Sequence, residues 1–319
     1  MNIKAMVVIT WLTERIDLLR GCSVFIDDVQ CALGTYSTEA DLGNFIDSLQ
    51  APGIGAALVL CDVAQCWFYS VSCQHLGQFA SLLSTKLTHD QLVILSTNLR
   101  NTFDISNVLS IIRDRIINLC SNPNILLTRQ SPGHYIHGPR IVVHVFKDNN
   151  IDSIGAVLNS ELEVVCKDGI LNYSNIGLIY NYLEDDMKSM VQNTLSSRSY
   201  RAGNSISLCD SGNIYSVEFP AVVVLHRMWG EKGRRHHYIY GEQPQHDNLQ
   251  QLYLEMSRAL VRCAVILYPG QGKSLEELGL VKSLLDLKEL KEFTHVIRHD
   301  SETPNLETAN FAPKRSKTS

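Results

Sequence analysis

Apolar and polar positions along the chain predict strands and helices in turn. Apolar runs of strand length stand at 23–30, 56–61, 66–71, 92–95, 141–146, 175–180, 206–209, 219–225 and 263–267. Apolar residues at helical spacing predict helices at 11–19, 37–50, 105–119, 151–165, 184–195, 248–258 and 275–293, and 74–87 is helical or irregular. Strands that alternate with helices are typical of parallel sheets covered on both faces, so the pattern predicts an α/β fold.

The pattern is interrupted once, in the middle of the chain. Ser121-Asn-Pro-Asn124 and Ser131-Pro-Gly133 carry the residues of turns and links, and the succession of strands and helices restarts after Pro139. We therefore expect one domain over 1–125 and a second over 135–295, with an inter-domain link between them. The polar segment 301–319 is expected to be a disordered tail.

Composition narrows the function classes. The chain has 319 residues, is 45% hydrophobic and 19% charged, and carries a formal net charge of -5. No global basic field draws it to nucleic acid, so a contact with single-stranded nucleic acid would need a local patch. No apolar run reaches the length of a membrane span, and the apolar start at 1–12 is short for a signal segment and runs into Glu14, so we expect a core helix there and no membrane partner.

Cysteine usage points to an intracellular protein, of the cytoplasm or the nucleus. The nine cysteines are an odd number and none forms a C-x-x-C pair. Cys61, Cys166 and Cys263 lie inside apolar runs, as reduced and buried thiols do. This pattern fits neither a disulfide framework nor a zinc site.

Two adjacent carboxylates follow the first strand. Asp27 and Asp28 stand at its carboxyl end, which is where ligands bind in open α/β sheets. Paired carboxylates there suit a magnesium ion and a base that activates water. The alternative is that they only terminate the strand.

Three charged residues occupy comparable places elsewhere. Arg100 follows the strand at 92–95, and it is either a phosphate clamp or a solvated loop charge. Glu218 precedes a strongly β-forming run, where it either binds a ribose or marks the start of the strand. Arg258 lies between a helix and a buried strand, and it either reaches over the sheet edge to a phosphate or is a surface arginine at a helix end.

Taken in order, these segments resemble the later motifs of superfamily 1 helicases, of the UvrD-like and Schlafen helicase-like kind. Ile26-Asp-Asp-Val-Gln30 is similar to the Walker B box, and the segments similar to the third to sixth motifs are Cys66–Gln74, Leu95–Thr102, Gly212–Val224 and Leu252–Ala259. The segment Tyr173–Tyr180 resembles the first strand region of the second RecA-like domain of that family. The resemblance runs from about Ser23 to Leu267, and its order and spacing are more specific than any one motif.

The resemblance implies two RecA-like parallel-sheet domains, the first incomplete, with ATP and Mg²⁺ in the cleft between them. The implied roles are Asp27 for magnesium, Asp28 at the place of the catalytic glutamate, Gln30, Gln74 and Arg100 on the nucleotide, Glu218 on the ribose and Arg258 as arginine finger. An arginine finger stabilises charge that develops in the transition state. We accordingly expect Arg258 to face the cleft and its replacement by alanine to leave folding nearly intact.

Departures from the family pattern bear on activity. The family's phosphate-binding loop, G-x-x-x-x-G-K-[ST], has no match in the 26 residues before Asp27. Asp28 is one methylene shorter than a glutamate, and Ser216 replaces a glycine. The expected function is a helicase-like P-loop NTPase fragment with impaired or absent hydrolysis on its own. The alternative is a non-catalytic module that binds protein partners and retains the helicase fold.

Two further segments carry alternatives. Pro269-Gly-Gln-Gly-Lys-Ser274 is placed like a phosphate loop, but Leu267 stands where its first glycine is required, so a tight turn with a capping box is the simpler interpretation. The basic cluster His226–His237, with Trp229, is either a contact for single-stranded nucleic acid or a solvated loop.

Overall fold

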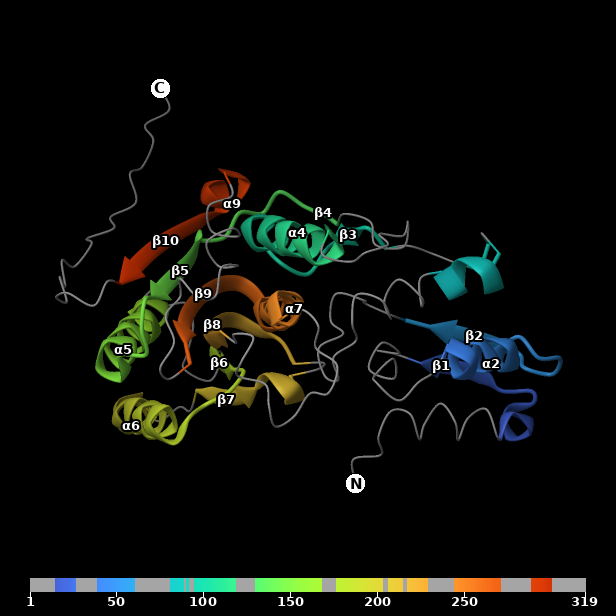
Figure 1. Cartoon of the computed structure of the whole chain (residues 1–319), viewed down its shortest axis with the longest axis horizontal. Coiled ribbons are helices and arrows are strands. Elements are labelled where there is room, and N and C mark those ends of the chain that lie inside the picture. The colour runs from blue at the N-terminus through green and yellow to red at the C-terminus, as the bar shows by residue number, and fades with distance from the viewer. Residues whose placement is uncertain are drawn as a thin grey trace.

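The computed structural model describes residues 15–26, 39–60, 81–88, 90–91, 95–118, 130–167, 176–202, 206–214, 217–228, 244–270 and 288–299. Its largest feature is a six-stranded sheet in the order β10-β5-β9-β8-β6-β7, in which every neighbouring pair is parallel (Figure 1). The strands are β5 (Ile141–Phe146), β6 (Ile176–Tyr180), β7 (Ser207–Asp210), β8 (Phe219–Met228), β9 (Ala259–Pro269) and β10 (Thr294–His299). The α/β fold with a parallel sheet, expected from the sequence, is confirmed.

Helices cover both faces of this sheet. On one face lie α5 (Ile151–Lys167) and α6 (Asp185–Ala202), whose apolar side chains share a core cluster with the strands. On the other face lie α4 (Phe103–Asn118), α7 (Pro244–Met256) and α9 (Lys288–Phe293), which share a second cluster. The central strands β8 and β9 are therefore buried on both sides, which explains their nearly continuous apolar runs.

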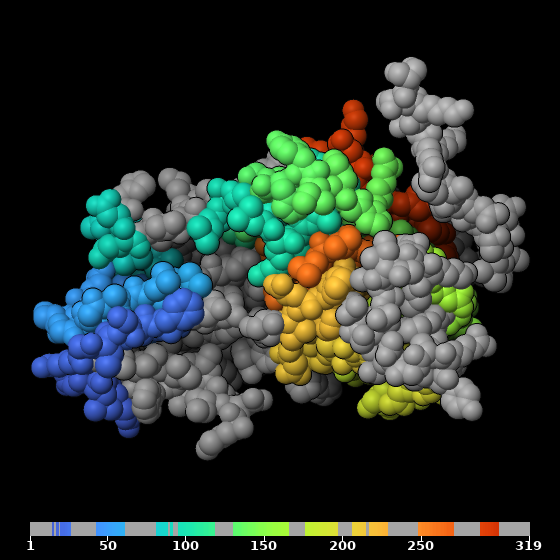
Figure 2. Space-filling model, turned by 180° about the vertical axis from the view of Figure 1, so that it is seen from behind, coloured from blue at the N-terminus to red at the C-terminus, as the bar shows by residue number. Residues whose placement is uncertain are grey.

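The first part of the chain forms a smaller group of elements. It comprises the 3₁₀ helix η1 (Ile16–Leu19), β1 (Ser23–Ile26), α2 (Glu39–Leu49) and β2 (Ala56–Val59), and β1 pairs with β2 in parallel. In Figure 2 these blue segments gather at one end of the molecule. The apolar run at 56–61 forms β2, whose four residues are all exposed and whose pairing partner among the described strands is β1.

A separate two-stranded sheet lies next to α4. β3 (Thr97–Asn98) pairs in parallel with β4 (Ser131–Pro132), so the segment at 131–133 is not a free link. The helix α4 that follows β3 packs into the same apolar cluster as α7 and the strands of the six-stranded sheet. In Figure 1, α4 lies beside α9 and above α7, over that sheet.

The carboxyl-terminal helix expected over 275–293 is described only as α9, since 271–287 lie outside the described residues. Immediately after α9 the chain forms β10, which pairs with β5 from Thr294↔Ile141 to His299↔Phe146. The sequence pattern did not predict this edge strand.

Candidate functional site

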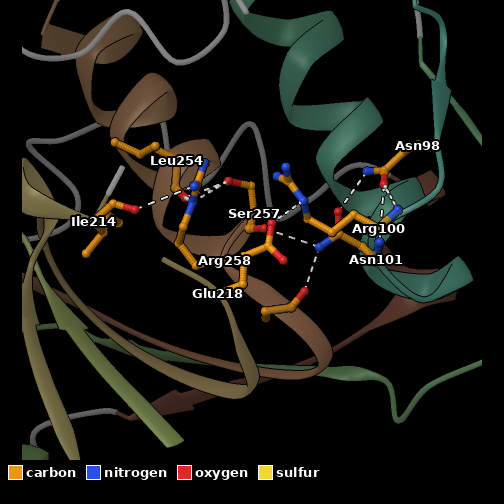
Figure 3. Close-up of polar contacts among 9 residues, drawn as sticks. Asn98, Arg100, Asn101, Ile214, Glu218, Leu254, Ser257 and Arg258 are labelled. Atoms are coloured by element: carbon orange, nitrogen blue, oxygen red, sulfur yellow. Dashed lines mark hydrogen bonds and ion pairs between the residues drawn. The ribbon is translucent and has the colours of Figure 1, made fainter. Parts of the chain in front are cut away.

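Three of the residues singled out from the sequence meet at the amino ends of β8 and β9. Glu218 stands directly before β8, and Arg258 stands in the turn between α7 and β9. The two strands are neighbours, with Phe219 opposite Ala259, and the Phe219 amide donates a hydrogen bond of 2.9 Å to the Arg258 carbonyl. Arg100, in the loop between β3 and α4, reaches the same place from the other side (Figure 3).

Packing beneath Glu218 fixes where its chain enters the sheet. The ring of Phe219 lies over Gly177 of β6, and a Cβ at position 177 would stand 2.4 Å from Phe219 Cδ2. A side chain at 177 would therefore displace the ring. Because Phe219 is seated inward against this glycine, the preceding Glu218 points away from the core and is exposed.

Arg100 and Glu218 form an ion pair at this edge. The Arg100 Nε lies 2.6 Å from the Glu218 Oε1, and the two side chains are 44% and 39% exposed. Ion pairs exposed to this extent contribute about 0–1 kcal/mol to stability, because water screens both partners. The pair is therefore exchangeable, and another anion of suitable shape can compete for the guanidinium.

Two asparagines hold the backbone that carries Arg100. The Asn98 Oδ1 accepts hydrogen bonds from the amides of Arg100 (3.0 Å) and Asn101 (3.2 Å). The Asn101 side chain is buried, and its Nδ2 donates to the carbonyls of Ala259 (2.6 Å) and Ser257 (3.3 Å). These contacts clamp the Arg100 loop onto the turn that contains Arg258. Neither asparagine was singled out from the sequence, although an asparagine two residues before Arg100 is a recognisable turn former.

Arg258 is not oriented as the sequence led us to expect. The residue is only 3% exposed, and its side chain turns inward from the sheet edge. Its Nε donates to the Leu254 carbonyl (3.3 Å) and to the Ser257 hydroxyl (3.2 Å), and its Nη1 donates to the Ile214 carbonyl (3.5 Å) (Figure 3). The expectation that Arg258 faces a cleft is therefore wrong. Carbonyls at the end of α7 need donors, and the arginine supplies them.

A second polar cluster lies near the carboxyl end of β8 and escaped the sequence analysis. His226 and Glu255 are both fully buried, with 2.7 Å between Nδ1 and Oε2. Burial raises the pKa of Glu255, and the neighbouring His226 opposes part of that rise. Asn181 connects this pair to Gln251 through its amide, at 3.3 Å from the Gln251 Oε1. The sequence offered one signal of this cluster. Gln251 and Glu255 are polar residues that lie four apart, and therefore on the same face, in a helix that is otherwise buried.

The basic cluster that begins at His226 is not simply a solvated loop. His226, Arg227 and Met228 belong to β8, and Arg227 pairs with Glu184 at 2.6 Å and stacks over the ring of Tyr182. The rest of the cluster, from 229 on, lies outside the described residues, as does 271–274 of the loop-like segment.

Four of the predicted site residues are not placed. Asp27, Asp28, Gln30 and Gln74 lie outside the described residues, so the approach of Arg100 to the acidic pair stays a prediction. Among the residues that are described, no group of three or more His, Cys, Asp or Glu side chains is arranged to hold a metal ion. In the same residues, no helix combines the length and the apolarity needed to cross a membrane.

Comparisons with known proteins find likeness among solved structures alone. No family model and no curated protein matches the chain. Among solved structures, the chain is similar to the C-terminal domain of a possible DNA helicase from Lactobacillus plantarum WCFS1, at 15% identity and a TM-score of 0.37. The likeness covers 62% of this chain and 98% of that one, and on its own it carries no conclusion about activity.

Proposed function

We propose that this chain is a helicase-like module that binds the polyphosphate of a nucleoside triphosphate at the Arg100–Glu218 edge without hydrolysing it by itself. The observation that supports the proposal is that Arg100 and Glu218 form an ion pair beside the main chain of Arg258, whose own side chain turns inward. The three residues come from three separate motifs of the resemblance, and they meet at the amino ends of two neighbouring strands. A planar guanidinium that is exposed and held by its backbone suits a phosphate group.

The proposed nucleotide lies between this edge and the pair Asp27/Asp28, with Mg²⁺ on Asp27. Ligands in open α/β sheets usually lie at the carboxyl ends of strands. Asp27 and Asp28 follow β1 and Arg100 follows β3, whereas Glu218 stands at the amino end of β8. A site at the amino ends therefore requires a second group of residues facing it. The resemblance to two-domain helicases provides that arrangement, and single-stranded nucleic acid is the partner it implies.

We propose that the chain does not hydrolyse ATP because of where the side chain of Arg258 lies and because Asp28 is shorter than a glutamate. A guanidinium bonded to the main-chain carbonyls of Leu254 and Ile214 is not available to charge that develops on a transferred phosphoryl group. An aspartate at the place of the catalytic glutamate holds its carboxylate one methylene further from water.

Calorimetric titration of the chain with ATP and Mg²⁺ tests the proposal. We expect binding tighter than about 1 mM, weakened about tenfold by Arg100→Ala, and no ATP hydrolysis above background. Arg20→Ala is the matched control, because Arg20 is also an exposed arginine in an ion pair, with Asp17 at 2.7 Å. The proposal would be contradicted if neither the wild-type chain nor its Glu218→Gln variant bound ATP. It would also be contradicted if Arg100→Ala and Arg20→Ala lost the same amount of affinity.

A second candidate is a non-catalytic module that binds protein partners. It is favoured by exposed apolar side chains around the short β3–β4 sheet, since such patches often mark interaction sites. Leu95, Leu99, Tyr135 and Ile136 are 74%, 71%, 86% and 66% exposed. Leu99 lies against Gly133, and Tyr135 lies beside Phe103 with 5.7 Å between ring centroids, so the segments adjoin. Retained folding without nucleotide binding would favour this candidate.

A further inference from the structure

We propose that Glu218 acts as a built-in competitor for anions at Arg100, so that a phosphate must displace its carboxylate in order to bind. The inference rests on the proposed function, because it concerns the regulation of the same site. A carboxylate and a phosphate both present oxygens to a guanidinium in similar geometry. In the structure the Glu218 carboxylate occupies the Arg100 Nε at 2.6 Å, and the arginine is therefore closed to another acceptor at that nitrogen.

Both partners stand on fixed backbone, and their side chains are free to separate. The backbone on either side of the Arg100 side chain is fixed, because Asn98 accepts the amides of Arg100 and Asn101, and Asn101 is bonded to the turn before β9. The chain at Glu218 is fixed through Phe219, whose amide donates to the Arg258 carbonyl. The Glu218 side chain is 39% exposed and the Arg100 side chain 44%. The two side chains can therefore separate into water while the backbone that carries each of them keeps its place.

The exposure of the ion pair determines how strongly Glu218 competes with a phosphate for Arg100. A pair open to solvent on both sides adds at most about 1 kcal/mol, which corresponds to a factor of about five in affinity. The ion pair of Arg100 and Glu218, which we call the gate, is therefore weak enough for a polyphosphate to displace the carboxylate. Its effect on affinity is large enough to be measured. Glu218 also repels an approaching anion, and this part of the effect acts at longer range and decreases with salt.

The test compares binding of inorganic tripolyphosphate and of ATP, each with Mg²⁺, to the full chain and to Glu218→Gln. Tripolyphosphate carries the phosphates without a ribose. We expect Glu218→Gln to bind tripolyphosphate about fivefold more tightly. We also expect the gain to disappear in the double variant with Arg100→Ala. Glu218→Asp keeps the charge but shortens the reach, and it should give a smaller gain in the same direction.

Asp186→Asn is the control for overall charge, because Asp186 is an exposed carboxylate in the first turn of α6, a helix on one face of the six-stranded sheet. An equal gain in Asp186→Asn, or unchanged tripolyphosphate binding in Glu218→Gln, would overturn the inference. If Glu218 only binds the ribose, Glu218→Gln weakens ATP binding and leaves tripolyphosphate binding unchanged, which also overturns it.

The outcomes separate this inference from the proposed function. If the wild-type chain binds ATP and Glu218→Gln binds tripolyphosphate no better, the gate is wrong and the nucleotide site stands. If neither the wild type nor Glu218→Gln binds either ligand, both are wrong. Binding that appears only in Glu218→Gln supports the gate. Unfolding curves of each variant confirm that the changes in affinity occur in folded protein.

Discussion

Arg258 shows how the surroundings of one residue decide its role. Its guanidinium is buried at 3% exposure and donates to the carbonyls of Leu254 and Ile214. A charge in this position holds the end of α7 to the segment before β8. It stabilises the turn from which β9 starts, and β9 lies next to the center of the sheet.

Replacement of Arg258 by alanine should therefore destabilise the protein. Two main-chain carbonyls would lose donors in a buried place, at a cost of about 2–4 kcal/mol in the free energy of unfolding. Urea unfolding measures the loss. Arg100→Ala is the comparison, because Arg100 is exposed and its pair is worth at most about 1 kcal/mol. Equal losses in the two variants would show that the buried contacts of Arg258 contribute nothing particular.

Glu255 gives a prediction about pH. Burial raises the pKa of this carboxyl in the folded chain above the value of about 4.3 that it has when unfolded. The folded chain then keeps the proton to higher pH than the unfolded chain does. The contribution of Glu255 to stability is therefore complete below about pH 4.3 and is lost as the pH rises through the raised pKa.

Glu255→Gln removes this dependence, because glutamine has the same shape and does not ionise. Relative to the variant, the wild-type chain should lose unfolding free energy as the pH rises above about 4.3. Urea unfolding of both proteins at several pH values tests this. Parallel curves for the two proteins would mean that the carboxyl of Glu255 does not titrate differently in the folded state.

At the scale of elements, the sequence predicted long apolar segments well and short ones poorly. The runs within β5, β8 and β9 are apolar on both faces, so their length and composition identify them without knowledge of their neighbours. β10 has only two apolar residues, Val296 and Ile297, and it directly follows α9, so the sequence shows no separate strand pattern there. β4 contains a proline and only two residues, and its pairing with β3 depends on a contact distant in sequence.

Some features of the candidate site could likewise be predicted from the sequence and others could not. Arg100 and Glu218 were found because each follows or precedes a recognisable strand, and the resemblance supplied their order. Their ion pair was not predictable, since it depends on how the loop after β3 docks beside β8. The burial of Arg258 was not predictable either, because residue type and spacing do not show which carbonyls surround the side chain. The pair His226 and Glu255 lies across two elements and carries no local motif.

At the scale of the whole molecule, α4 determines what folds together. The helix precedes the segment 121–133, where the sequence suggested a link, and yet it contributes a row of buried apolar side chains to the core of the six-stranded sheet. These are Ile105, Val108, Leu109, Ile111, Ile112 and Ile116, each at most 4% exposed. Burying them is worth on the order of 10 kcal/mol. That is comparable to the stability of an ordinary domain.

We therefore predict that a chain of residues 95–299 folds cooperatively and that a chain of 135–299 does not. Without α4, the face of the sheet beneath it and the side of α7 it covers would be open to water, and the remaining core would be loosely packed. Near-ultraviolet circular dichroism, thermal unfolding and binding of a dye for exposed apolar surface compare the two. The shorter chain should show a broad transition and strong dye binding. A sharp transition at the same temperature in both would place the boundary of the folding unit after α4, at the link expected from the sequence.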